Sequence, residues 1–151
     1  MAGYRQRIVV GVDGSESSKQ ALRWAIRQAE LTGGSVDAVT AWHYPSSYGL
    51  APLPGDGDDF DGDAKRVLTE ALAEVSGLAP EVQVEPLVAQ GHPATVLLEA
   101  AQGADLLVVG SRGHGGFTSA LVGSVSLYCV LHARCPVLVV RDGHPGADAS
   151  Q

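Results

Sequence analysis

The residues best suited to chemistry lie in segment 107–126, where an apolar stretch runs into GSRGHGGFTSALVGSVS. Gly110, Gly113 and Gly123 follow the spacing G-x2-G-x9-G, and Ser124 comes directly after the last glycine. Because glycine has no Cβ, main-chain N–H groups there can approach a polyanion, and a helix that begins at this point adds unpaired amides and the positive end of its dipole. The pattern therefore predicts a site for phosphate groups.

Other phosphate-binding motifs do not occur in the sequence. There is no Gly-Lys-Ser/Thr of a Walker A loop and no G-x-G-x-x-G of a dinucleotide fold. Arg112 would either offset phosphate charge or lie solvated over the loop. His114 is a candidate for proton transfer, but the sequence places no carboxylate or second histidine beside it, so a solvated loop histidine is favoured. The segment predicts binding rather than catalysis.

Short apolar segments alternate with helical patterns along the chain, which is typical of a parallel sheet covered on both faces. The predicted strands are residues 7–12, 36–42, 82–88, 105–109 and 136–141. The predicted helices are one that follows Ser15 and stops at Gly33, one at 64–75, one that begins at Pro93 and one at 123–132, and 43–62 is predicted to be a surface loop. We expect a single α/β domain over residues 1–142, built on a doubly wound five-stranded parallel sheet with helices on both faces, and a frayed polar tail at 143–151.

Asp13 ends the first predicted strand, as the glycine motif ends the fourth. Ligands of doubly wound sheets bind at the carboxyl ends of strands, so Asp13 and the loop 110–113 flank one crevice if these strands are neighbours. A nucleotide would match it: the carboxylate would accept from ribose hydroxyls, the loop and Ser124 would hold phosphates, and the backbone of 39–41 would face a base. Asp-Gly-Ser before a helix is also a common capping arrangement, which alone would account for Asp13.

Composition and charge narrow the class of protein. A chain of 151 residues with 45% hydrophobic residues and a net charge of −7 is typical of one compact domain, and not of a general nucleic-acid or anionic-membrane binder. No apolar run approaches the roughly 18 residues of a membrane span, and no secretory signal is recognisable, so we expect cytoplasmic residence. Cys129 and Cys135 have neither CxxC spacing nor histidine partners, which favours packing over metal or redox chemistry.

An acidic run at 56–63 invites a calcium hypothesis, because Asp59, Asp61 and Asp63 alternate as calcium ligands do. A calcium loop needs glycine at its sixth position, which here is Ala64, and a helical pattern starts there at once. A solvated acidic loop that places negative charge at a helix N-terminus is therefore favoured, and we assign no metal site made by protein groups alone.

The whole pattern resembles the universal stress protein family, specifically its nucleotide-binding subgroup, through IVVGVDGSESSKQAL near the start and VVGSRGHGGFTSALVGSVSLYCVLHARCPVLVV near the end. In that family G-x2-G-x9-G-Ser/Thr marks members that bind ATP. The resemblance implies a sheet of order 3-2-1-4-5 and a homodimer that pairs residues 137–140 of two copies. Segment 127–129 departs from many relatives, which carry a polar or histidine-containing run there, and is expected to alter helix packing or the dimer surface.

Carried over position by position, the resemblance implies a ligand set for ATP accompanied by Mg²⁺. Val12 and Asp13 would lie on the adenosine side, and Val39 and Ala41 in the base pocket. The phosphate side would comprise Gly110, Gly113, Gly123, Ser124, Val125 and Ser126. We add Arg112 to this set because of its place inside the loop. The sequence identifies no protein ligand for Mg²⁺.

Two classes of function stay open. The first, which we favour, is an ATP-binding stress or signalling module, in which occupancy alters loops and a dimer surface that a partner reads and any hydrolysis is slow. The second is an ATP-hydrolysing or adenylyl-transferring enzyme, for which the sequence offers no catalytic group and no second domain for an acceptor. A third is a dimerisation module with an empty crevice, against which the intact glycine spacing argues.

Overall fold

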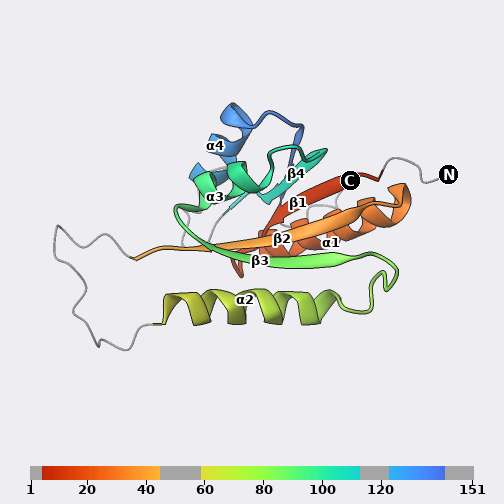
Figure 1. The fold of residues 1–151 in the computed structure, drawn as a ribbon, viewed down its shortest axis with the longest axis horizontal. Helices are drawn as coiled ribbons and strands as arrows, with labels where there is room; N and C mark the ends of the chain where they lie inside the picture. Colours follow the sequence, from red (N-terminus) through yellow and green to blue (C-terminus); the bar gives the residue numbers. More distant parts are fainter. Residues whose placement is uncertain (1–4, 45–58, 113–122, 142–151) are drawn as a thin grey trace, which may run out of the picture.

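The computed structural model describes residues 5–44, 59–112 and 123–141. Within these residues the elements are β1 (Arg7–Gly11), α1 (Glu16–Thr32), β2 (Ser35–Trp42), α2 (Phe60–Val75), β3 (Val84–Gln90), α3 (Pro93–Ala100), β4 (Leu106–Gly110), α4 (Ser124–His132) and β5 (Val137–Val140). The strands form one parallel sheet in the order β3-β2-β1-β4-β5 (Figure 1). The predicted α/β fold and its strand order are confirmed.

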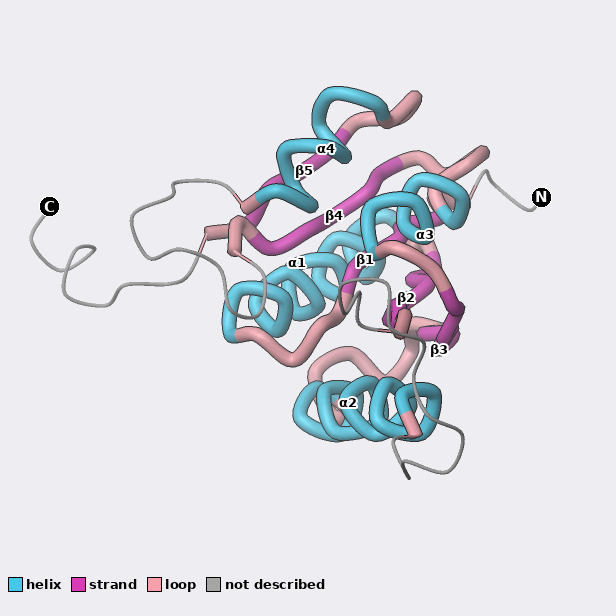
Figure 2. The backbone as a smooth tube through the Cα atoms, turned by 90° about the vertical axis from the view of Figure 1, so that its left-hand side faces the viewer, coloured by secondary structure: helices cyan, strands magenta, loops and turns pink. Residues whose placement is uncertain are grey.

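Helices cover both faces of the sheet because its central strands are apolar on both sides. In β1, Ile8 and Val10 belong to the core shared with α1 and α2, whereas Val9 belongs to the core shared with α3 and α4, and all three are fully buried. α1 and α3 lie on opposite sides of β1 (Figure 2). Two cores therefore fix the positions of β1 and its neighbour β4, whose carboxyl ends were predicted to carry the site.

The start of α2 differs from its prediction. The helix begins at Phe60 rather than Ala64, so the predicted loop 43–62 ends before Gly62. The side chain of Asp59 accepts a hydrogen bond from the Gly62 N–H at 2.9 Å and caps the helix. Asp59 therefore caps α2, and Asp61 and Asp63 place negative charge in its first turn.

The bounds of β3 also differ from their prediction. The sequence predicts this strand at 82–88, whereas it pairs with β2 from Val84 to Gln90. The reason is local, because the Val82 N–H donates a hydrogen bond to the Ala79 carbonyl in a turn before the strand. The other strands, and the starts and ends predicted for α1, α3 and α4, lie within one or two residues of their predicted positions.

Three further observations complete the fold. α1 ends at Gly33, whose φ of 72° is the left-handed conformation typical of a glycine after a helix. Among the residues that the structure describes, no helix is long and apolar enough to cross a lipid bilayer. The predicted tail 143–151 lies outside the described residues.

Candidate functional site

The two halves of the glycine motif meet at the main chain of Ser111, directly after β4. The Ser111 carbonyl accepts hydrogen bonds from the Gly123 N–H and, at 3.3 Å, from the Ser126 hydroxyl. The Ser111 N–H donates to the Val140 carbonyl at 2.8 Å. These bonds hold together the end of β4, the end of β5 and the start of α4, although the intervening segment 113–122 lies outside the described residues.

The start of α1 lies against the same loop. The Ser17 hydroxyl donates to the Arg112 carbonyl at 2.7 Å and lies 3.3 Å from the Arg112 N–H, from which it accepts. The Ser15 hydroxyl is 3.3 Å from that same carbonyl oxygen. The N-termini of α1 and α4 therefore both flank the end of β4, where the positive ends of two helix dipoles favour an anion.

Gly110 allows this close approach. A Cβ built on Gly110 would lie 2.5 Å from the Ser17 hydroxyl oxygen, 2.7 Å from the Ser17 carbonyl carbon and 2.8 Å from the Ser18 amide nitrogen. Two of these atoms belong to the backbone of α1 and cannot move aside without displacing the helix. The first glycine of the motif is thus needed to bring α1 against β4, whatever further part it plays toward a ligand.

Asp13 has a local role that the sequence anticipated. Its Oδ1 accepts hydrogen bonds from the Ser15 N–H at 2.9 Å and from the Ser15 hydroxyl. Ser15 in turn caps α1, with its hydroxyl accepting from the Ser18 N–H at 3.3 Å. The capping interpretation is confirmed in this form, with Asp13 orienting the residue that caps the helix rather than capping it directly. Because the Ser15 hydroxyl bonds both to Asp13 and to the Arg112 carbonyl, Asp13 lies close to the loop that follows β4.

The base side of the predicted site is closely tied to the sheet. The Val12 N–H donates to the Val39 carbonyl and the Thr40 hydroxyl donates to the Val12 carbonyl, both at 2.8 Å. The Val39 side chain is 1% exposed, within the core beneath α3 and α4, so its side chain is occupied in packing. Ala41 is only half-buried at the edge of that same core. Of the two predicted base-pocket residues, Ala41 has the more accessible side chain.

The N-terminus of α4 differs from those of α1 and α2. Its N-cap, Gly123, supplies no side-chain hydrogen bond, whereas Ser15 and Asp59 cap α1 and α2. The first intrahelical bond runs from the Leu127 N–H to the Gly123 carbonyl. The amides of Ser124, Val125 and Ser126 precede that bond, and none donates to another described residue.

The serines of this turn have different roles. Ser124 is exposed, and its hydroxyl bonds to no described residue. Ser126 is 2% exposed, and its hydroxyl donates to the carbonyls of Ser111 and Gly123 at 3.3 and 3.4 Å. An anion at this helix end would therefore meet the Ser124 hydroxyl and main-chain amides, while the Ser126 hydroxyl fastens the turn.

Charge and metal-binding groups around the turn are few. The main chain of Arg112 bonds to Ser17, and the half-buried residue forms no ion pair with any described residue. Gly113 and His114 fall outside the described residues. Across the described part of the chain, no three or more His, Cys, Asp or Glu side chains are grouped so that they could hold a metal ion.

Sequence reasoning missed three polar residues that build the site. Ser17 and Ser111 are 1% and 2% exposed, and Thr40 is 4% exposed within an otherwise apolar strand. Each is buried with its hydroxyl or main chain bonded to the strand ends described above. A threonine inside an apolar strand is a detectable signal for Thr40, because a buried hydroxyl needs a partner. Nothing in the sequence distinguishes Ser17 from its serine neighbours.

The two cysteines pack as predicted. Cys129, on the inner side of α4, is fully buried, and Cys135 is half-buried against the same core. Burial in apolar surroundings disfavours the thiolate and raises the pKa of Cys129 to about 11, with a smaller contribution from Cys135. Burial also raises the pKa of Cys135. Neither thiol has the lowered pKa of a reactive cysteine.

Comparisons with known proteins agree with this architecture. A universal stress protein of Mycobacterium tuberculosis is 40% identical over 136 residues, which cover 89% of this chain and 45% of the relative. The chain thus spans about half the length of the curated relatives it matches.

Solved structures with the same fold carry adenine nucleotides. A universal stress protein in complex with cAMP has a TM-score of 0.68 and 28% identity, covering 93% of this chain and 100% of that one. One from Archaeoglobus fulgidus in complex with dAMP has a TM-score of 0.62 and 26% identity, covering 91% and 98%. The model of the universal stress protein family matches residues 5–141, nearly the whole chain, and the chain therefore belongs to that family.

Proposed function

We propose that this protein is an ATP-binding module that acts in stress response or signalling. The observation that carries the proposal is the uncapped N-terminus of α4, which Ser111 holds at the end of β4 beside the N-terminus of α1. Related proteins are described in complex with cAMP and dAMP, which supports an adenine nucleotide as the ligand here.

The phosphates would lie on the amides of residues 124–126 and the hydroxyl of Ser124. Those amides donate to no other described residue, and an anion would satisfy them while interacting favourably with the helix dipole. Arg112, whose neighbour Ser111 bonds to Gly123, would add a positive charge to this site in a chain of net charge −7. We propose ATP as the nucleotide because the sequence has the G-x2-G-x9-G-Ser/Thr spacing which, by the family resemblance, marks members that bind ATP.

The adenosine part would extend from that turn toward β1 and β2. Asp13, at the end of β1, would accept from the ribose hydroxyls, and Ala41, half-buried near the end of β2, would contact the base. Mg²⁺ would bind mainly through the phosphates and water, as it does in many nucleotide sites. We assign no residue of this chain to the metal and none to hydrolysis.

We further propose that the protein works as a homodimer through β5. This strand is the last of the sheet and bonds only to β4 among the described residues. Its four residues are all apolar and half-buried, and an apolar strand edge left open is prone to pair with another chain. Antiparallel pairing of two copies would satisfy the free edge of each.

The direct test is to denature freshly purified protein with acid and to identify any released nucleotide by chromatography. A Gly123→Asp variant is the sharpest comparison, because aspartate at the N-cap would accept from the α4 amides that no described residue satisfies and would repel phosphate while favouring the helix. Gly123→Ser is the matched control, since it caps the helix without charge. Gly113→Val adds a variant in the loop itself.

ATP released from the wild-type protein but not from Gly123→Asp would support the proposal, and released ADP would indicate hydrolysis within the same site. Isothermal titration with Mg²⁺-ATP gives the affinity where no nucleotide is retained. We expect Gly123→Asp to bind at least about tenfold more weakly than Gly123→Ser. A folded wild-type protein with no measurable affinity for ATP would contradict the proposal. Equal affinities of Gly123→Asp and Gly123→Ser for ATP would also contradict it.

A further inference from the structure

Two histidines that are far apart in the sequence lie next to each other in the fold. His43 directly follows the last residue of β2, and His92 is the N-cap of α3. The centroids of their imidazole rings are 5.8 Å apart, and the ring planes meet at 82°. Both residues are exposed. The pair therefore offers imidazole nitrogens from two chain segments to the solvent, and the nucleotide proposal assigns no role to either residue.

Main-chain hydrogen bonds fix the distance between the two histidines. The Gly91 N–H donates to the Trp42 carbonyl at 2.8 Å, so each histidine comes directly after one partner of this bond. β2 and β3 are paired up to that point, with Trp42 opposite Gln90. The His92 carbonyl accepts from the Val96 N–H at 2.9 Å at the start of α3. Both side chains thus leave a well-held part of the backbone, as a preformed site requires.

Aromatic contacts hold the residues on either side of His43. The Tyr44 ring makes edge-to-face contacts with the rings of Trp42 and Phe60, at centroid distances of 5.5 and 5.6 Å. Phe60 begins α2, which lies on the side of the sheet away from α3 (Figure 1). The neighbours of His43 are therefore tied to the layer of α2, whereas His43 itself contacts the first residue of the opposite layer.

The arrangement of the two rings suits a shared metal ion. Imidazole nitrogens bind Zn²⁺ at about 2.0–2.1 Å, so two rings on one tetrahedral ion have centroids roughly 5 Å apart. Small rotations of two exposed side chains would bring the observed pair to that separation. Within the described residues, no third His, Cys, Asp or Glu joins the pair, so water would occupy the other positions on the ion. The net charge of −7 favours the approach of a cation.

We propose that His43 and His92 form a surface site for a divalent transition metal ion of the class that prefers imidazole, which includes Zn²⁺, Cu²⁺ and Ni²⁺. Each histidine supplies one ring nitrogen to the ion. The site is distinct from the Mg²⁺ that would accompany ATP, because Mg²⁺ prefers oxygen ligands and binds mainly through phosphates. The inference goes beyond the proposed nucleotide function and does not depend on it.

Isothermal titration of the untagged full chain with Zn²⁺ tests this site. Wild type and variants are compared at equal nucleotide content, because phosphates also bind metal ions. His43→Phe is the sharpest variant, since phenylalanine can keep the ring contact with His92 but has no nitrogen for the ion. His132→Phe is the matched control, because this exposed histidine has Tyr128 as its ring neighbour instead of a second histidine.

We expect His43→Phe to weaken the tightest Zn²⁺ binding by at least about tenfold, because two linked ligands bind one ion far better than either does alone. His92→Phe should cause a similar loss, and His132→Phe should cause none. Equal Zn²⁺ affinities in wild type and all three variants would overturn the site and leave the two rings as a packing contact.

Two further results would also overturn the proposal. One is a folded wild-type chain with no measurable affinity for Zn²⁺. The other is a loss of affinity in only one of His43→Phe and His92→Phe, because the ion would then not be held by the pair. Titration of the wild-type protein with ATP tests the nucleotide proposal separately, so failure of the metal site and failure of nucleotide binding are distinguishable.

Discussion

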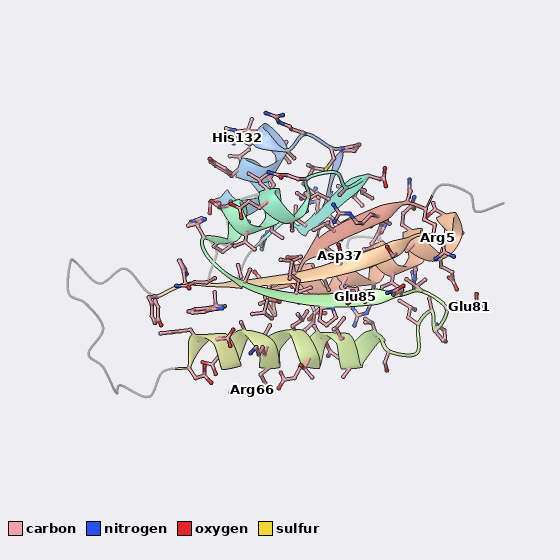
Figure 3. All side chains as sticks on the ribbon, in the orientation of Figure 1. Arg5, Asp37, Arg66, Glu81, Glu85 and His132 are labelled. Carbon is pink, nitrogen blue, oxygen red and sulfur yellow. The ribbon has the colours of Figure 1, made fainter. Side chains whose placement is uncertain are left out.

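At one edge of the sheet, β3 carries Glu85 and Pro86 and lies against α2, whereas at the other edge β5 carries four apolar residues beside α4. Proline and charge on an edge strand discourage pairing with another chain. Glu85 on β3, Arg66 on α2 and His132 on α4 are labelled in Figure 3, with Arg66 and His132 on opposite sides of the molecule. Of the two edge strands described, β3 thus carries features that discourage pairing, whereas β5 carries neither proline nor charge.

The helices beside the two edges differ in the same way. α2 buries Ala64, Leu68, Ala71 and Val75 on its inner side and carries charge outside, where Lys65 and Arg66 pair with Asp61 and Asp63. α4 carries apolar residues on both sides. The apolar stripe of α2 meets the sheet, whereas α4 leaves four large apolar side chains exposed on its outer side. The two helices therefore differ in the side chains that face away from the sheet, which are charged on α2 and apolar on α4.

The largest effect is expected from Leu68→Ala. Leu68 is 2% exposed on the inner side of α2, and its removal leaves a cavity in the core, so the free energy of unfolding should fall by about 2–5 kcal/mol. Leu131→Ala, at a leucine of α4 that is 68% exposed, should change the free energy of unfolding by no more than about 0.5 kcal/mol when the protein is dilute enough to be monomeric. Urea denaturation followed by circular dichroism measures both values. Similar losses in the two variants would mean that α4 does not present an exposed face.

The elements of the fold could be predicted from the sequence because each has a strong local signal. Apolar runs define the strands, and Gly33 ends α1 where the apolar pattern stops. The predicted starts of α2 and β3 are wrong because, at each of them, a local hydrogen bond overrides the apolar pattern of the sequence. Asp59 caps α2 before its apolar stripe begins, and a turn at Val82 delays β3 although that residue is a good strand former.

The candidate site could be predicted in part. The sequence predicts that the glycine motif and Asp13 meet at the carboxyl ends of the strands, and Gly110, Arg112 and Gly123 do lie together there. The close fit of α1 against Gly110 could not be predicted, because it depends on a helix nearly a hundred residues earlier in the chain. Such contacts between distant segments leave no periodic signal in the sequence, so a buried serine looks like any other.

Ser17→Ala is expected to have the next largest effect, on the side of the molecule that includes β4 and β5. It removes the hydroxyl that bonds both the carbonyl and the N–H of Arg112 and leaves those groups without this partner in a buried setting. The free energy of unfolding should fall by about 1–3 kcal/mol. Ser76→Ala is the matched control, because its exposed hydroxyl donates to the Ala73 carbonyl at 3.1 Å and water can replace it. Denaturant midpoints compare the pair, and an equal loss in both would contradict a special role for Ser17.

The N-termini of α2 and α4 are compared through the stabilities of two variants, Asp59→Ala, which removes a cap, and Gly123→Asp, which adds one. Loss of the Asp59 cap should lower the free energy of unfolding by about 1 kcal/mol. Gly123→Asp should leave it unchanged or raise it, because α4 gains the cap that it lacks. Thermal unfolding without nucleotide measures both changes. If Gly123→Asp is the more destabilised of the two, the amides of α4 are not free in the way that the nucleotide proposal requires.

The smallest effect is expected at Cys129, on the sealed inner side of α4, and it appears only in alkaline solution. Burial raises the pKa of this thiol from 9.0 to about 11, so between those values the folded chain binds more protons than the unfolded chain. The stability that this difference contributes is complete below about pH 9 and is lost as the pH rises toward 11.

Lysines and tyrosines also titrate in this range, so the wild-type protein must be compared with Cys129→Ala, in which the other groups are unchanged. The free energy of unfolding from urea denaturation should fall more steeply between pH 9 and 11 in the wild type than in the variant. Parallel slopes would mean that water reaches the thiol in the folded chain. In that case water would reach the side of α4 that packs on the core, and the two sides of the helix would differ less in their exposure to solvent.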